Sequence, residues 1–165
     1  MILRCTGRVL ALLGGHAVTL TEPPPSDDDW YLNLLWVDRQ KCLLLTHAGT
    51  LFSVFVAGVR KADLRPIGPY AVTVIESELR SEGLPRDVLG PLDPARVQLA
   101  KTVSRSVLGF MNDMAVHIDY ANASAGGLSH CDPDAISRQF RRTLHNRGDY
   151  VRPLELVAQR LGEHA

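Results

Sequence analysis

The chain has 165 residues, of which 45% are hydrophobic and 22% are charged, and these proportions exclude a largely disordered protein. Eighteen basic and eighteen acidic side chains give a formal net charge of zero. The overall charge therefore excludes general attraction to nucleic acid or to an anionic membrane, and such binding would need a local patch.

Three cysteines without CxxC or Cys/His spacing predict neither a disulfide framework nor a zinc site. They favour a reducing compartment. The N-terminal apolar run Val9 to Leu13 is too short for a signal peptide, and no stretch approaches the roughly 18 apolar residues that cross a bilayer. We therefore expect a cytoplasmic protein without membrane contact.

The first 29 residues predict a short strand, a short helix and a surface loop. Ile2 to Cys5 form the strand, Thr6 is a suitable N-cap, and the glycines at 14 and 15 end the helix. Residues 21–29, TEPPPSDDD, contain three prolines and three aspartates, which favour an exposed loop.

The strongest pattern lies between Trp30 and Gly58. The runs WYLNLLWVD, KCLLLTH and TLFSVFVAG have the length of strands and are separated only by Arg39-Gln40 and Ala48-Gly49. Such short connections predict an antiparallel meander. Consecutive apolar residues at 42–45 further predict a central strand that helices cover on both faces.

The rest of the chain predicts one more strand, at 97–103, and then mostly helices. The expected helices begin near Pro69, at Ser104, at Asp132-Pro133 and at Pro153. Strands followed by helices are typical of the α+β class. We predict a single domain over 1–165: an antiparallel sheet of five to six strands packed by about four helices.

Asp113 and His117 are the first candidate functional residues. Their spacing of four places both on the polar side of the helix that follows Ser104. A carboxylate beside an imidazole occurs in general-base and metal sites, but also as an ordinary pair on a solvated helix face. Asn33 and Asn112 are candidate polar partners in a shared pocket.

The segment ISRQFRRTLHNR, residues 136–147, is the second candidate. Ile136, Phe140 and Leu144 predict a buried seam, with basic side chains on the opposite side. These basic residues are Arg138, Arg141, Arg142, His145 and Arg147. Such a stripe can contact the nucleic-acid backbone or an acidic protein partner, or can simply be a solvated face.

Three segments carry a resemblance to a known family. They are MILRCT at the start, WYLNLLWVDRQKCLLLTHAGTLFSVFVAGVRKADL in the strand region and SRSVLGFMNDMAVHI in the long helix. Together they resemble a family of small bacterial proteins that is catalogued as a domain of unknown function. The resemblance implies a cytosolic bacterial domain and transfers no catalytic role.

Two functions remain open from the sequence. The first is a non-enzymatic binding or regulatory module that acts through protein or nucleic-acid contacts of the 138–147 helix or of an exposed groove. The second is a small hydrolase or metal-assisted enzyme whose site includes Asp113 and His117. We predict neither a cofactor nor a metal site, because no dinucleotide, phosphate-loop or zinc motif occurs.

Overall fold

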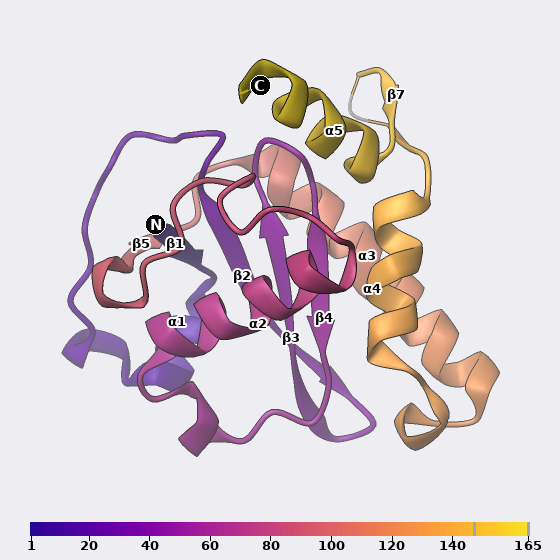
Figure 1. Cartoon of the computed structure of the whole chain (residues 1–165). Helices are drawn as coiled ribbons and strands as arrows, with labels where there is room; N and C mark the ends of the chain where they lie inside the picture. Colours follow the sequence, from indigo (N-terminus) through magenta and orange to yellow (C-terminus); the bar gives the residue numbers. More distant parts are fainter. Residues whose placement is uncertain (147, 165) are drawn as a thin grey trace.

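The computed structural model describes residues 1–146 and 148–164. Within them, the main sheet has five strands in the order β4-β3-β2-β1-β5 (Figure 1). These strands are β1 (Ile2–Cys5), β2 (Trp30–Val37), β3 (Gln40–His47), β4 (Ser53–Val56) and β5 (Gln98–Lys101). A small ribbon of β6 (His145–Asn146) and β7 (Tyr150–Val151) precedes the last helix.

The α+β class is confirmed, but the sheet is mixed, so the prediction of an antiparallel sheet is wrong. β2, β3 and β4 form the expected antiparallel meander. β1 instead pairs in parallel with both β2 and β5. Parallel neighbours need a long crossover, and residues 6–29 provide one between β1 and β2.

Helices cover both faces of the sheet, and the described residues contain five of them rather than about four (Figure 1). Residues of α1 (Gly7–Leu13), α2 (Ile67–Ser81) and α5 (Pro153–His164) pack on one face. Residues of α3 (Arg105–Ala125) and α4 (Pro133–Arg142) pack on the other. Short 3₁₀ helices span Gly15–Ala17, Lys61–Leu64, Pro94–Arg96 and Leu128–His130.

The two-sided burial explains the apolar runs of the central strands. In β2, Leu32 and Leu34 belong to the α2 side of the core, whereas Tyr31 and Leu35 belong to the α3 side. Neighbouring residues of β3 divide in the same way. Because successive strand residues point to opposite faces, both sets must be apolar when both faces are covered.

The ends of α3 and α4 confirm the predicted capping. The Ser104 side chain accepts a hydrogen bond from the Val107 N–H at 3.2 Å, and Gly126 ends α3 at a φ of +81°. Asp132 accepts from the Asp134 N–H at the start of α4. These local signals therefore place both helices correctly.

The tip of the β2–β3 hairpin is attached to the C-terminal end of α3. Asp38 and Arg39 have φ values of +47° and +62°, as in a type I′ turn. The Asp38 carboxylate accepts hydrogen bonds from the Leu128 N–H and the Asn122 amide, at 2.6 and 3.1 Å. These bonds hold the pKa of Asp38 below its ordinary value.

Both edges of the sheet are partly covered. The Ser137 hydroxyl of α4 accepts a hydrogen bond from the Phe55 N–H of β4 at 2.9 Å. On the other edge, the Thr21 N–H donates to the Leu99 carbonyl of β5 at 2.8 Å. Such contacts satisfy edge groups that would otherwise be available to another strand.

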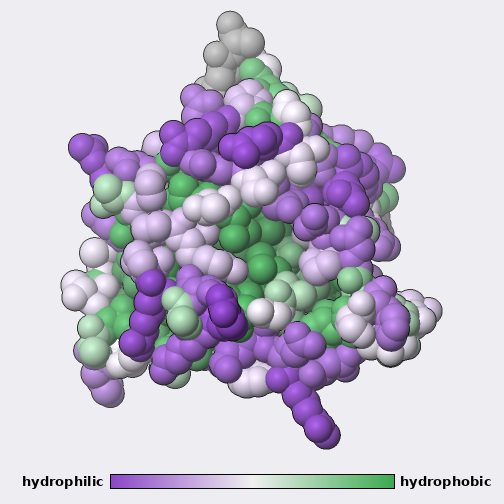
Figure 2. All heavy atoms as spheres, turned by 60° about the horizontal axis from the view of Figure 1, so that its bottom comes forward, coloured by the Kyte–Doolittle hydropathy of each residue, from purple (hydrophilic) through white to green (hydrophobic). Residues whose placement is uncertain are grey.

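The face of the molecule drawn in Figure 2 is largely hydrophilic but not uniformly so. Seen from the end where the β2–β3 hairpin lies, apolar side chains form the floor of a hollow that hydrophilic side chains surround (Figure 2). No helix within residues 1–146 or 148–164 has the length and apolar character that crossing a membrane requires.

Candidate functional site

A groove of about 330 Å³ lies between α3 and α4. Met114 and Ala121 of α3 and Ile136 and Phe140 of α4 give it an apolar lining. Its volume lies at the lower end of the range that is usual for ligand pockets. An apolar lining of this size can hold one side chain of a partner or a small ligand.

The polar side chains of the groove come from three elements. His117 and Tyr120 belong to α3, Gln139 belongs to α4, and Thr143 and His145 follow it. The groove therefore brings together one residue from each sequence candidate, His117 and His145. Their convergence depends on the packing of α3 against α4, for which the sequence gives no signal.

The hydrogen bond of His117 fixes which ring nitrogen is free. Nδ1 lies 2.8 Å from the backbone carbonyl of Asp113. A carbonyl can only accept, so Nδ1 carries the proton and Nε2 of the neutral ring keeps its lone pair. Asp113 and His117 are neighbours on α3, as predicted, but the imidazole contacts the backbone of Asp113 rather than its carboxylate.

His145 has the opposite arrangement. Its Nε2 lies 2.9 Å from the Phe140 carbonyl and donates to it, so that Nδ1 of the neutral ring is the free acceptor. The ring packs edge-to-face on Phe110, with 4.8 Å between the ring centroids. The main-chain and aromatic contacts hold this half-buried histidine in place.

The other proposed polar partners lie elsewhere. Asn112 and Asp113 are exposed on α3, and neither makes a side-chain hydrogen bond or ion pair within the described part of the chain. Asn33 instead accepts a hydrogen bond from the Thr6 hydroxyl at 3.1 Å, before the first helix. Neither asparagine lines the α3–α4 groove.

The predicted arginine stripe is only partly exposed, and the expectation that Arg141 faces outward is wrong. Arg141 is completely buried, with its guanidinium 2.5 Å from Glu78, 3.3 Å from Glu82 and over the ring of Phe52. Burial lowers its pKa, which the charge of Glu78 partly offsets. The predicted seam also differs, because Leu144 is 47% exposed.

The remaining arginines of the stripe are exposed but also have acidic neighbours. Arg142 lies 2.6 Å from Glu82, and this hydrogen bond is the main cause of the lowered pKa of Glu82. Arg138 lies 3.6 Å from Asp132. Arg147 lies outside the described residues. The charges of α4 are thus directed largely at carboxylates of the chain itself.

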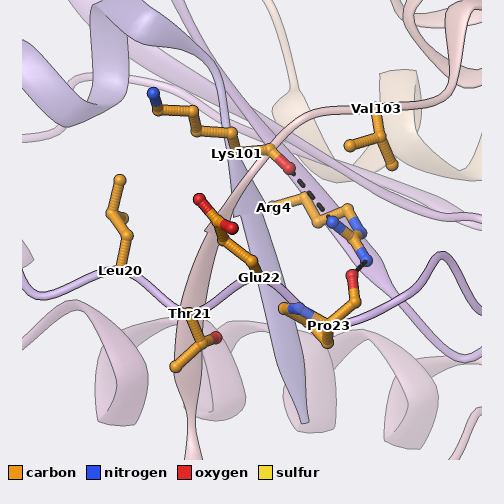
Figure 3. Close-up of a pocket in the computed structure, with 7 residues that line it drawn as sticks. All are labelled: Arg4, Leu20, Thr21, Glu22, Pro23, Lys101 and Val103. Atoms are coloured by element: carbon orange, nitrogen blue, oxygen red, sulfur yellow. Dashed lines mark hydrogen bonds between the residues drawn. The ribbon is translucent and has the colours of Figure 1, made fainter.

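A second cavity of about 330 Å³ lies beside β1 and β5, and its floor contains a buried cation that the sequence candidates did not include (Figure 3). Arg4 donates to Asp29 at 2.5 Å, to the Lys101 carbonyl at 3.1 Å, and to the carbonyls of Pro23 and Pro24. The sequence signal that could have identified this buried cation is the arginine within the otherwise apolar strand ILRC.

The contacts of Arg4 indicate a structural role. Its guanidinium is directed at protein oxygens, and it fixes the proline-rich loop against the end of β5. The loop is largely exposed, as predicted, except that Asp29 is buried with Arg4. We therefore regard the α3–α4 groove as the better candidate site.

The chain matches the family model described as Domain of unknown function (DUF6933) over residues 2–156. The chain belongs to this family. The DUF6933 match includes the complete main sheet and both walls of the groove, and it confirms the resemblance seen in the sequence. A search of curated proteins found no match.

Proposed function

We propose that this DUF6933 chain is a non-enzymatic binding module that recognises a partner protein through the α3–α4 groove. The observation that carries the proposal is the apolar groove, with the 74% exposed ring of Tyr120 lining it. Leu144 is also exposed, between two residues that line the groove. Accessible aromatic and aliphatic side chains beside a pocket are typical of protein-binding surfaces.

The charges of α4 support a protein partner over nucleic acid. Binding to phosphates requires cations that are free to replace counterions. Arg141 is buried between two carboxylates, and Arg142 shares one of them. The two arginines are therefore poor candidates for contacts with a nucleic-acid backbone, although the basic pattern in the sequence indicated them as strongly as the other basic residues of the stripe.

We also propose that the chain works as one domain in the bacterial cytoplasm. The free thiols of Cys5, Cys42 and Cys131 support a reducing compartment. The main sheet and helices α1 to α4, which cover both of its faces, fall within one family match, which supports a single unit.

A photo-crosslinking experiment tests the proposal. Benzoylphenylalanine replaces Tyr120 in the groove or, as a control, Tyr70 on α2, and adducts formed in living cells are identified by mass spectrometry. The captured protein is then purified and its affinity is measured for wild type and Thr143→Trp, which fills the groove. We expect an adduct specific to position 120 and at least tenfold weaker binding by Thr143→Trp. Equal adducts at both positions, or unchanged affinity, would contradict the proposal.

One observation favours the enzymatic alternative. His117, whose Nε2 keeps its lone pair, lines a groove in which it could act as a general base. Against this, within residues 1–146 and 148–164 no group of three His, Cys, Asp or Glu side chains is arranged to hold a metal. Uptake of a transition metal, or hydrolase activity, that disappears in both Asp113→Ala and His117→Ala would favour the enzyme.

A further inference from the structure

We infer that the segment recognised by the groove is basic, with a lysine or arginine side chain that lies along the apolar lining and places its cation between His117 and His145. This inference rests on the proposed function and specifies the chemistry of the partner. Its support comes from hydrogen-bonding polarity, from charge and from an exposed aromatic ring.

Three of the five polar side chains that line the groove, those of His117, Thr143 and His145, offer only acceptors, whereas Tyr120 and Gln139 offer both donors and acceptors. Nε2 of His117 and Nδ1 of His145 both keep lone pairs, because the opposite nitrogen of each ring donates to a backbone carbonyl. The Thr143 hydroxyl donates to the Gln139 carbonyl at 2.8 Å, which leaves its oxygen as an acceptor. Ammonium and guanidinium groups carry donors only, so they complement such a site.

The charge around the groove favours a cation in the same way. Beyond Arg105 at its first position, α3 carries Asp113 and Asp119 and no lysine or arginine. Asp113 lies one turn before His117 on α3 and has no ion pair within the described residues. The arginines of α4 each have a carboxylate within 4 Å.

The ring of Tyr120 adds an interaction that a neutral side chain would not gain. It is 74% exposed and lines the groove, so its face is accessible to a cation. Cations over aromatic rings gain electrostatic attraction, and arginine gains stacking as well. The long apolar stem of either basic side chain can cover Met114 and Ile136 in the groove.

Small fragments test the charge preference directly. The labelled methyl group of Met114 reports binding by NMR in titrations with n-butylguanidinium, n-butylammonium, n-butanol and butyrate. We expect both cations to bind with Kd on the order of 1–10 mM, at least fivefold more tightly than n-butanol, and butyrate to bind least. Equal affinity for n-butanol and the cations, or tighter binding of butyrate, would overturn the inference.

Variants locate the acceptors. Leucine keeps much of the volume of histidine but has no lone pair. The double variant His117→Leu/His145→Leu should therefore bind n-butylguanidinium at least fivefold more weakly than wild type. His16→Leu, at an exposed site in the 3₁₀ helix after α1, is the matched control and should leave the affinity unchanged. If His145→Leu alone alters the fold, His117→Leu at its exposed position should still give a measurable loss. Unchanged binding by His117→Leu would refute the role of its Nε2.

A peptide arm separates this inference from the proposed function. A short helical peptide with arginine flanked by leucines should bind more tightly than n-butylguanidinium, and its arginine-to-glutamine version should bind more weakly. If both peptides bind equally, protein recognition stands and the basic preference is wrong. If the fragments bind but the peptide gains nothing and position 120 gives no specific adduct, the groove is a small-cation site and the protein-binding proposal fails.

Discussion

Replacing Arg141 by leucine tests whether this arginine stabilises the fold rather than contacting a partner. The guanidinium is fully buried and joins α4 to α2 through Glu78, a residue that lies 63 positions earlier in the sequence. Arg141→Leu leaves the Glu78 carboxylate, whose side chain is 11% exposed, without its cation. A buried charge without its partner is the main cost of such a change.

The expected loss follows from which carboxylates lose their partner. Breaking a buried ion pair by removing one member typically costs about 3–5 kcal/mol. Glu82 keeps its hydrogen bonds to Arg142, so only Glu78 is left unpaired. We therefore expect the free energy of unfolding to fall by about 3 kcal/mol. For a chain of this size, that corresponds to a decrease in Tm of about 6–12 °C.

Urea unfolding at pH 7, followed by circular dichroism, measures the effect. Adding Glu78→Leu to Arg141→Leu removes the unpaired charge and should restore stability to within about 2 kcal/mol of wild type. Arg142→Leu, on the half-exposed neighbour, should cost at most about 1 kcal/mol. The reasoning is refuted if Arg141→Leu costs less than 1 kcal/mol, or if the double variant is less stable than the single one.

Three further predictions concern other contacts of the fold. The Leu128 N–H holds the pKa of Asp38 below its ordinary value of 3.8. Wild type should therefore be more stable than Asp38→Asn at neutral pH, and this difference should disappear as the pH falls through the lower folded-state pKa. Urea unfolding at pH 7, 4 and 2 measures the difference. Burial raises the pKa of Cys5 to about 12, so iodoacetamide at pH 8 should leave Cys5 unmodified in the native protein, as mass spectrometry would report. Ser137→Ala removes the acceptor of the Phe55 N–H and should cost about 1–3 kcal/mol in urea unfolding.

Each of these predictions has a control or a contradicting result. If the difference in free energy of unfolding between wild type and Asp38→Asn stays constant from pH 7 to 2, the charge of Asp38 does not stabilise the fold. Cys131, which is only partly buried, should react with iodoacetamide before Cys5. Ser129→Ala, at an exposed hydroxyl, should change the free energy of unfolding by no more than about 0.5 kcal/mol.

The sequence predicted the elements of the fold better than their arrangement. Strands β2 to β4 and the starts of α3, α4 and α5 lie close to the predicted positions, because short turns, caps and prolines act over a few residues. The parallel pairing of β1 was missed, because residues 6–29 carry no signal for the strand beside which the chain returns. Among the site candidates, only the contact between Asp113 and His117 follows from local spacing, and it involves a backbone carbonyl.

The sequence by itself determined which strands must be covered on both faces and where the helices begin. It could do so because hydrophobic periodicity and helix capping are local properties of the chain. Only the tertiary structure decided which polar side chains are functional candidates. The same α4 places Arg141 in the interior, between Glu78 of α2 and the ring of Phe52, and places Arg142 at the surface beside Glu82. The packing of α3 beside α4 likewise brings His117 and His145 to one groove, a contact between residues distant in sequence that no local pattern encodes.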